Sequence, residues 1–426
     1  MSKVLGAAML RRLLKAYFRS GSLRVIDPDG QLIVVGDGAE TALTVRFDNW
    51  AIIRKLALNP ALHLPEGYMN GEIEIEGGSI YDFLLHLKQS RKGGKKPGAE
   101  SRSKSFQKLL RRLFQFNPAR VASRNARHHY DLNAEMYRLF LDADMQYSCG
   151  YFEKVSDDLE TAQAAKKRHI AAKLCIEPGM RVLDIGCGWG GMAIYLAQTC
   201  GAEVVGVTLS PEQRRIAEQR AVAAGVADCV TFLEQDYRAV EGPFDRVVSV
   251  GMFEHVGVAH FGEFFRKVRE LLAVDGIALL HSIARRNGPS ATNEFIRKHI
   301  FPGGYSPAIS EIVPEIEKTR MFINDIEVWR DHYGYTCRHW RERFAANRVQ
   351  AAALFDERFC RMWEFYLATS ELTFMQGSHI VVQIQLSKAR DAVPRSRNYI
   401  EAWEKQQPID SREPERAPAA VSGGSS

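Results

Sequence analysis

A glycine-rich turn between an apolar run and a helical run is the strongest chemical signal in this 426-residue sequence. From Arg181 to Gly191 the chain reads RVLDIGCGWGG, and MAIYLAQTC follows. Such a strand, turn and helix let a ligand approach the backbone closely, because glycine has no Cβ. The free N–H groups at the start of the next helix suit an anionic group. We therefore predict a nucleotide-type ligand at Gly186, Cys187 and Gly188.

The residues around this turn discriminate between nucleotides. The turn also satisfies G-x-G-x-x-G, but a dinucleotide site expects an acidic residue about 20 positions further on, at the end of the second strand. That strand, EVVGVTLS, ends in Thr208, Leu209 and Ser210 instead. Asp184 precedes the turn directly, as in the first motif of class I S-adenosylmethionine (SAM) methyltransferases, which the sequence resembles here. We expect Asp184 either to contact SAM or only to hold the turn.

Two later segments agree with a SAM methyltransferase. Asp236 and Tyr237 follow a third strand-like run, VTFLEQD, where such enzymes hold the adenine. The run FDRVVSVGMFEHV then supplies a fourth strand that opens on the active site. The expected fold is α/β: a doubly wound, Rossmann-like class I SAM-methyltransferase sheet with helical insertions, plus a small N-terminal α+β domain.

Motifs spread from residue 128 to residue 400 resemble the cyclopropane fatty acid synthases and the related mycolic acid cyclopropane synthases. The matching segments are HHYDLNAEMYRLFLDADMQYSCGYF, LDIGCGWGGMA, GVTLSPEQ, VSVGMFEHVG, LLHSI, IFPGG, DHYGYT and VPRSRNYI. The N-terminal region, with PDG and EGYMNGE, resembles that of the members that act on phospholipids. The resemblance implies that SAM provides a methylene group to the cis double bond of unsaturated phospholipid acyl chains, closing a cyclopropane ring through a carbocation.

The same resemblance implies roles for individual residues. A bound bicarbonate that removes the proton would be held by Glu254, His281 and Tyr333 and by the backbone at Cys149. SAM would be contacted by residues of four segments, namely Tyr147, Ser148, Gly186, Cys187, Gly188, Thr208, Leu209, Gln213, Asp236 and Tyr237. Each catalytic candidate also has a structural interpretation: a helix-start carboxylate for Glu254, a core histidine for His281, packing for Tyr333 and a buried apolar thiol for Cys149.

One position departs from the family pattern. Many members have a second cysteine in a YL-x-x-C-x-x-x-F segment, sometimes given as the active-site residue, and this chain has Ser370 there, in YLATSELTF. The resemblance therefore makes Ser370 a fifth catalytic candidate. The substitution leaves open a second product, a 10-methylene or 10-methyl branched chain made on the same scaffold. A lipid-binding protein without catalysis is a third hypothesis, which the intact motifs disfavour. A nucleic-acid methyltransferase is disfavoured because the Asn-Pro-Pro-Tyr type of target-base motif is absent.

The elements that must position these residues fall into four predicted regions. Residues 1–90 should form the N-terminal lipid-docking domain, 91–106 a basic flexible linker, 107–400 the catalytic domain and 401–426 a disordered tail. Within the first region, residues 3–18 read as a basic amphipathic helix, either at a membrane interface or packed on its own domain. Seven scattered cysteines without a CxxC pair predict no metal site.

Charge and hydropathy set the expected location. Residues 1–120 hold 20 Lys and Arg against 11 Asp and Glu, whereas the remaining chain holds 37 against 40. This asymmetry favours an acidic partner, which we predict to be an anionic membrane surface rather than nucleic acid. No run reaches the roughly 18 to 20 apolar residues of a membrane span. We therefore expect a cytoplasmic enzyme bound peripherally to the inner face of the cell membrane, and the resemblance also implies a possible homodimer.

Overall fold

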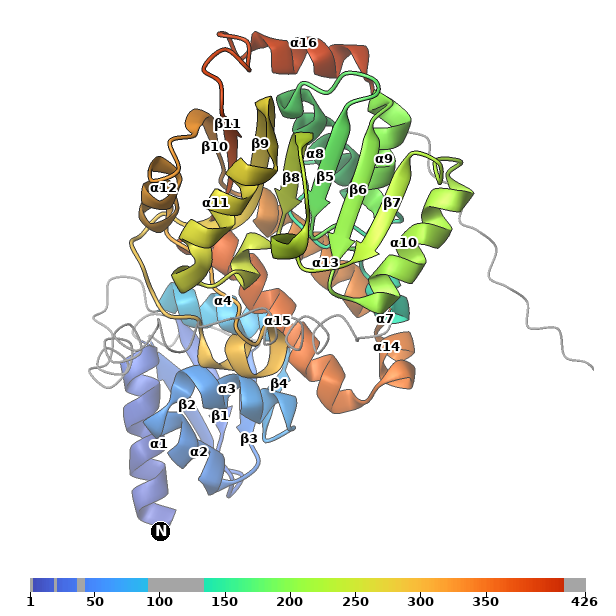
Figure 1. Ribbon diagram of the computed structural model, residues 1–426. Helices are drawn as coiled ribbons and strands as arrows, with labels where there is room; N and C mark the ends of the chain where they lie inside the picture. The colour runs from blue at the N-terminus through green and yellow to red at the C-terminus, as the bar shows by residue number, and fades with distance from the viewer. Residues whose placement is uncertain (1–2, 19–20, 37–42, 91–133, 410–426) are drawn as a thin grey trace, which may run out of the picture.

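The computed structural model describes residues 3–18, 21–36, 43–90 and 134–409 of the chain (Figure 1). A four-stranded sheet lies in the N-terminal part and a seven-stranded sheet in the rest. The predicted linker, residues 91–106, lies outside the described residues, as do residues 107–133 of the predicted catalytic domain.

The N-terminal part is an α+β unit, as expected. Its elements are α1 (Lys3–Tyr17), β1 (Ser22–Ile26), β2 (Leu32–Gly36), β3 (Thr44–Phe47), α2 (Trp50–Leu58), α3 (Pro60–Met69), β4 (Ile73–Glu76) and α4 (Ile80–Ser90). The strand order is β2-β1-β3-β4, and β1 and β2 pair antiparallel around the predicted PDG turn. Helix α1 packs on its own domain, since Leu10, Leu14 and Phe18 are buried. This fits the second of the two interpretations for residues 3–18.

The larger part begins with α7 (Ala134–Arg138) and ends with α16 (Asn398–Gln406). Its strands are β5 (Arg181–Ile185), β6 (Glu203–Thr208), β7 (Val230–Glu234), β8 (Phe244–Val250), β9 (Leu272–Arg285), β10 (Phe322–Trp329) and β11 (His379–Ser387). Its α-helices are α8 (Leu159–Leu174), α9 (Gly191–Cys200), α10 (Pro211–Ala223), α11 (Phe261–Leu271), α12 (Ile309–Glu317), α13 (His332–Ala346), α14 (Arg348–Leu354), α15 (Glu357–Gln376) and α16 (Asn398–Gln406). The described residues also form three short 3-10 helices and one π-helix. The 3-10 helices are η1 (Tyr237–Ala239), η2 (Phe253–His255) and η3 (Val258–His260), and the π-helix is η4 (Ile296–Ile300).

The seven strands are ordered β10-β11-β9-β8-β5-β6-β7. Strands β5 to β9 pair parallel with their neighbours, and β11 runs antiparallel between β9 and β10. The sequence order reverses between β5 and β8, which is where open α/β sheets bind ligands at the carboxyl ends of their strands. This is the doubly wound sheet that the sequence predicts.

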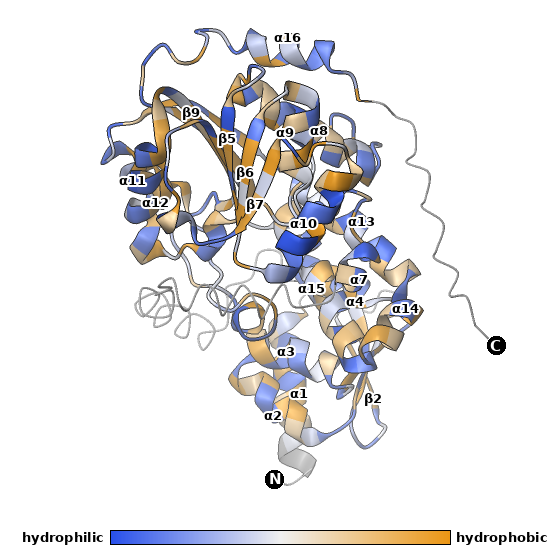
Figure 2. Ribbon diagram, turned by 45° about the vertical axis from the view of Figure 1, so that its right-hand side comes forward, coloured by the Kyte–Doolittle hydropathy of each residue, from blue (hydrophilic) through white to orange (hydrophobic). Residues whose placement is uncertain are grey.

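Apolar residues on both faces of the central strands hold the helices in place. In β5, Val182 belongs to the cluster under α8, α9 and α10, whereas Leu183 belongs to the cluster under α11 and α12. Successive strand residues point to opposite faces, so a nearly continuous apolar run is what a sheet covered on both sides requires. The hydropathy colouring shows these strands as largely apolar and the nearby helices α10 and α11 as more polar (Figure 2).

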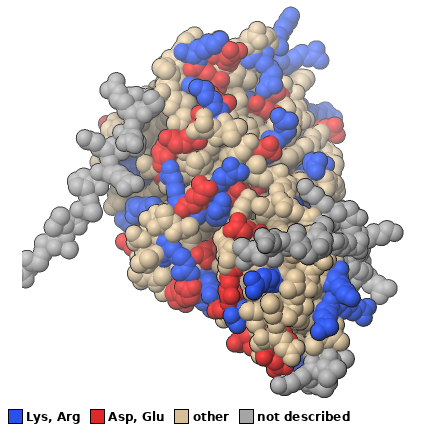
Figure 3. All heavy atoms as spheres, turned by 180° about the vertical axis from the view of Figure 1, so that it is seen from behind, with Lys and Arg blue, Asp and Glu red and all other residues tan. Residues whose placement is uncertain are grey.

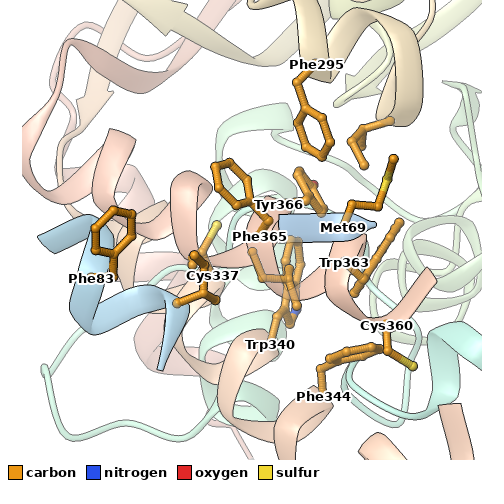
Figure 4. Close-up of a cluster of buried hydrophobic side chains, with 14 of the residues drawn as sticks. Met69, Phe83, Phe295, Cys337, Trp340, Phe344, Cys360, Trp363, Phe365 and Tyr366 are labelled. Carbon is orange, nitrogen blue, oxygen red and sulfur yellow. The ribbon is translucent and has the colours of Figure 1, made fainter. Parts of the chain in front are cut away.

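The two parts share one hydrophobic core. Met69 of α3 and Phe83 of α4 lie in the same buried cluster as Phe295, Trp363 and Tyr366 of the larger part (Figure 4). Helix α15 runs along this junction (Figure 1). The N-terminal unit is therefore packed against the sheet domain and does not stand apart from it.

One predicted boundary is wrong. Residues 401–406 belong to α16 and are not part of a disordered tail. The helix is held because Ile400 is buried and Glu404 Oε1 lies 2.7 Å from Nδ1 of His169 in α8. Residues 410–426 lie outside the described residues.

Candidate active site

A cavity of about 160 Å³ lies at the carboxyl ends of β5, β6, β7 and β8. A loop that precedes α8, residues 145–148, closes its remaining side. All eleven residues predicted to contact the cofactor line this cavity: Tyr147, Ser148, Asp184, Gly186, Cys187, Gly188, Thr208, Leu209, Gln213, Asp236 and Tyr237. The topology explains this convergence, because parallel strands present their carboxyl ends at one edge of the sheet.

The glycine turn has the backbone conformation that its sequence predicts. Gly186 and Gly188 have φ of 84° and 55°, values that favour glycine. The N–H groups of Gly186 and Cys187 both donate to the carbonyl of Val207, which fixes the turn against β6. A Cβ on Gly188 would meet no protein atom within 4 Å. The turn therefore leaves open space on its cavity side, as close approach of a ligand requires.

Asp184 ends up in a position that fits both of its proposed roles. Its side chain is buried, and its Oδ2 atom has no hydrogen-bond partner among the described residues. Burial raises the pKa of this carboxyl to about 7. An unpartnered buried acceptor is costly unless a ligand or water satisfies it, which favours contact with the cofactor.

The ends of β6 and β7 provide polar groups that are held by their neighbours. Thr208 Oγ1 donates to Oε1 of Gln213 at 2.7 Å. Asp236 accepts hydrogen bonds from the backbone N–H and the guanidinium of Arg238, at 2.9 and 3.2 Å. The first contact fixes a side chain where a dinucleotide site would have its acidic residue, and the second holds Asp236 at the position expected for the adenine.

A second cavity of about 100 Å³ adjoins the first. Tyr147, Ser148, Gly251 and His255 line both. The second cavity brings together four of the five predicted catalytic residues, namely Glu254, His281, Tyr333 and Cys149. They come from η2, β9, α13 and the loop before α8, so only the folded chain can assemble them.

Glu254 is the ionisable group best placed for chemistry. The backbone N–H of Ile283 donates to its Oε1 at 2.6 Å, and its buried Oε2 has no hydrogen-bond partner within the described part of the chain. Burial raises the pKa of its carboxyl to about 7, against the opposing effect of the Ile283 N–H. The carboxyl can therefore exchange a proton near neutral pH.

The other three groups are held neutral by burial. Burial lowers the pKa of His281 well below its usual value, and Nδ1 of His281 lies 3.2 Å from the amide Nε2 of Gln383 on β11. Burial also raises the pKa values of the Tyr333 phenol and the Cys149 thiol far above neutrality. Cys149 is therefore a neutral thiol and not a nucleophile, because nucleophilic attack needs the thiolate.

The fifth catalytic candidate is not brought to the site. Ser370 lies half-buried on α15 and is absent from the described residues that line the two cavities. Tyr366, one turn earlier, points to the site instead, and its hydroxyl lies 2.9 Å from the hydroxyl of Tyr147. Ser370 therefore lines neither cavity, although it lies on the same face of α15 as Tyr366, because the helix carries it one turn further along its axis.

Aromatic rings form much of the wall around the second cavity. Tyr147 packs against Trp340 with ring centroids 5.1 Å apart, and Tyr333 meets the same ring edge-on at 5.7 Å. Phe301, which lines the cavity, meets the ring of Tyr366 edge-on at 5.9 Å. These rings give an apolar surface with π density, which attracts a positive charge.

Several residues near the site were not found from the sequence. They are the cavity residues Met145, Gln146, Trp189, Arg238 and His255, and the supporting residues Gln163, Lys166, Tyr366 and Gln383. Gln383 gives a signal that could have been read, since it is a polar residue inside the apolar run HIVVQIQLS. The others carry no comparable mark.

The sheet and the cofactor cavity define a class I SAM-dependent methyltransferase. The model of the mycolic acid cyclopropane synthetase family matches residues 118–384, and a domain of unknown function matches residues 9–93. The chain belongs to the mycolic acid cyclopropane synthetase family and is a SAM-dependent methyltransferase.

Relatives from two bacteria cover most of the chain. The cyclopropane-fatty-acyl-phospholipid synthase of Escherichia coli strain K12 is 38% identical over 328 residues, which are 76% of this chain and 82% of the relative. The tuberculostearic acid methyltransferase UfaA1 of Mycobacterium tuberculosis is 33% identical over 396 residues, or 87% and 89% of the two chains.

Solved structures agree with the family. The cyclopropane synthase MmaA2 from Mycobacterium tuberculosis superposes with a TM-score of 0.61 at 31% identity. The mycolic acid cyclopropane synthase CmaA1, in complex with SAH and CTAB, superposes with a TM-score of 0.59 at 32% identity. Each match covers 64% of this chain and 99% of the other.

Proposed function

We propose that this enzyme transfers a methylene group from SAM to the cis double bond of unsaturated phospholipid acyl chains and forms a cyclopropane ring. The observation that carries the proposal is that two cavities lie side by side and share Tyr147, Ser148, Gly251 and His255 as lining residues. One cavity has the strand ends and glycine turn of a SAM site. The other is bounded by aromatic rings and contains a buried carboxyl, that of Glu254.

The reaction explains why the second cavity has this composition. The π electrons of the alkene attack the sulfonium methyl group, S-adenosylhomocysteine (SAH) leaves, and a carbocation forms on the acyl chain. Aromatic faces stabilise such a charge, and an apolar wall keeps water from it. One proton then leaves the new methyl group, and its C–H electron pair closes the ring. The site therefore needs a base beside an apolar channel.

Bicarbonate fits the residues around Glu254. The unpartnered Oε2 of this carboxyl, the ring of His281, the hydroxyl of Tyr333 and the backbone at Cys149 provide both donors and acceptors in one cavity. These are the groups that would hold a small hydrogen-bonding anion. When bound, bicarbonate supplies a base. The test is the reaction rate in carbonate-free buffer, which should fall and recover when bicarbonate is added back.

A branched product is the second candidate. The identity of 33% to the tuberculostearic acid methyltransferase UfaA1 extends over 87% of this chain, so the scaffold does not by itself select ring closure. In that case the methyl group would remain as a 10-methylene or 10-methyl branch. A 10-methylene branch also forms by loss of a proton from the new methyl carbon, after a hydride shift along the chain has moved the cation to the carbon that bears the methyl group. The C–H electron pair then forms a double bond instead of closing the ring. A saturated 10-methyl branch needs a reductant in addition.

Product analysis distinguishes these functions. Purified protein is incubated with SAM and vesicles of cis-monounsaturated phospholipid, and the fatty acids are examined by proton NMR. Shielded ring protons support the synthase, whereas exocyclic alkene protons or a branched methyl signal support the second candidate. If SAH binds but no product forms, the protein is a lipid-binding relative without catalysis and the proposal is wrong.

We further propose that the enzyme docks on the anionic inner face of the cell membrane through its basic N-terminal region, residues 1–120, whose positive charge is concentrated in residues 91–120 and not in the expected docking domain, residues 1–90. Residues 1–90 hold ten Lys and Arg against ten Asp and Glu, whereas residues 91–120 hold ten against one. The face shown in Figure 3 carries charges of both signs intermixed. No helix among the described residues is long and apolar enough to cross a bilayer.

Salt and charge variants test this docking. Each Lys or Arg near an anionic surface contributes roughly 1 kcal/mol. Binding to phosphatidylglycerol vesicles should therefore weaken steeply with added salt, and the triple variant Lys92→Ala, Lys95→Ala, Lys96→Ala should bind less tightly. The matched control changes three basic residues of the folded part, Arg24, Arg46 and Lys405. Equal losses in both variants, or no salt dependence, would contradict the proposal.

A further inference from the structure

A fully buried lysine lies beneath the wall that the two cavities share. Lys166 of α8 has no exposed surface, and its Nζ donates to Oγ of Ser148 at 2.7 Å and to Oε1 of Gln146 at 2.6 Å. Ser148 lines both cavities and Gln146 lines the first.

The chemistry of this contact fixes the direction of the Ser148 hydroxyl. A lysine ammonium can only donate, so Ser148 Oγ must be the acceptor in their hydrogen bond. The hydroxyl proton of Ser148 is then left to donate to another group. Burial lowers the pKa of Lys166 only to about 8, so most molecules carry the ammonium form at neutral pH.

The same contact fixes the amide of Gln146. Since its Oε1 accepts from Lys166, its Nε2 must point the other way, and it donates to Oδ2 of Asp144 at 3.0 Å. A Cβ on Gly191 would overlap this amide, so the loop packs directly against the start of α9. The loop thus touches the helix that follows the glycine turn.

The backbone of the loop is held from the same helix. Gln163, one turn before Lys166 on α8, donates from Nε2 to the carbonyl of Ser148 at 2.8 Å and to that of Gln146 at 3.3 Å. Gln163 and Lys166 together leave the Ser148 side chain little freedom to rotate. The hydroxyl is therefore prepared before a ligand arrives, which reduces the entropy lost on binding.

We propose that Lys166 is a positioning residue for the methyl donor, because it holds the Ser148 hydroxyl as a hydrogen-bond donor toward an acceptor of SAM or SAH. The proposal rests on the proposed function, since it takes the first cavity as the SAM site. It adds a part of the cofactor site that lies outside the cavity lining and acts through Ser148.

Calorimetric titration with SAH tests the proposal without a lipid substrate. Lys166→Met keeps an unbranched side chain of four heavy atoms but removes the nitrogen and its donors. A hydrogen bond lost to a charged acceptor weakens binding by about tenfold or more, and we expect that increase in Kd for Lys166→Met and for Ser148→Ala. The Kd of SAH for the double variant should not exceed the higher of the two single-variant Kd values, because both changes remove the same contact.

Lys173→Met provides the matched control. Lys173 is also fully buried on α8, but its partners are Asp325 and Glu327 of β10. The control should lower the melting temperature and leave the Kd of SAH within about twofold of wild type. If Lys166→Met lowers the melting temperature but leaves the Kd unchanged, Lys166 is only structural and the proposal is wrong. Additive effects in the double variant would also overturn it.

Further outcomes distinguish a failure of this inference from a failure of the proposed function. If Lys166→Met does not fold, Lys166→Gln keeps an uncharged N–H donor on a side chain that is one atom shorter, and it should also raise the Kd; a Kd equal to that of wild type would overturn the proposal. If the wild-type protein itself does not bind SAH, the proposed function fails as well as this inference. If wild type binds SAH and turns over lipid while both Lys166 variants bind normally, only the inference fails.

Discussion

The backbone N–H of Ile283 donates a hydrogen bond to Oε1 of Glu254 at 2.6 Å and leaves Oε2 as a buried atom without a hydrogen-bond partner among the described residues. Strand β9 thus holds one carboxylate oxygen of Glu254, and the other oxygen is left for a ligand of the second cavity. This arrangement makes Glu254 the most direct target for mutation.

Glu254→Gln keeps an oxygen for the Ile283 N–H but removes the ionisable group. We expect product formation to fall by about 100-fold or more, because positioned acid–base groups contribute that much to rate. The Kd of SAH should stay close to that of wild type, since Glu254 lines the second cavity and not the first. Glu241→Gln, an exposed change at the end distant from the strands' carboxyl edge, is the control. Retained turnover in Glu254→Gln would remove the carboxyl from the mechanism.

The same substitution should stabilise the protein at high pH. The carboxyl pKa of Glu254 is about 7 in the folded state against 4.5 for an exposed glutamate. Between these values the folded state holds a proton that the unfolded state has lost, so the free energy of unfolding falls as pH rises through this window. The full loss, reached above about pH 7, is of the order of 3 kcal/mol.

Urea unfolding from about pH 5 to pH 8 measures this dependence. Glu254→Gln should show a smaller decline than wild type and be the more stable protein at the upper end. Asp184, whose pKa is also raised to about 7, should leave a residual decline in the variant. Parallel curves for wild type and Glu254→Gln would show that Glu254 is not the titrating group.

Gly188→Ala should separate ligand binding from backbone strain. Gly188 and Gly225 both have positive φ, and a Cβ at either meets no atom within 4 Å. Alanine at either position should cost about 1 to 2 kcal/mol of stability, because positive φ is unfavourable with a Cβ. Only the Gly188 variant should lose affinity for SAH, by about tenfold or more. Equal SAH affinities in the two variants would mean that the ligand does not approach this turn.

Variants of Ser370 test the account by an expected lack of effect. Because Ser370 lies on α15 outside both cavity linings, Ser370→Cys and Ser370→Ala should leave the product unchanged and the rate within about twofold of wild type. Tyr366→Phe, one turn away, breaks the hydroxyl contact with Tyr147 and should lower the rate more. A changed product in either Ser370 variant would restore this position to the site.

Most of the residues that line the first cavity could be predicted because they follow strand ends, whereas Tyr147 and Ser148 needed the family resemblance. The turn after β5 and the short segments after β6 and β7 each follow an apolar run, and the sheet order brings them together. The second cavity needed the family resemblance, since Cys149, Glu254, His281 and Tyr333 lie far apart in the chain. Their spacing in the sequence does not predict that these four residues line one cavity.

Features set by tertiary packing were missed. The face of α15 that reaches the site is fixed by the core it shares with α3 and α4, so Ser370 and Tyr366 could not be ranked from the sequence. The tail boundary was wrong because the contact between Glu404 and His169 joins residues 235 positions apart. Lys166 reads as an ordinary charged position of a helix until burial and its two partners are known.

The central claim is that the new methyl group loses one proton as the ring closes. The most direct test uses SAM with a fully deuterated methyl group, vesicles of cis-monounsaturated phospholipid, and analysis of the chains by mass spectrometry and NMR. The account predicts a gain of CD2 with the deuterium in a cyclopropane ring. Deuterium in an exocyclic alkene, a retained CD3 branch, or no transfer at all would contradict it.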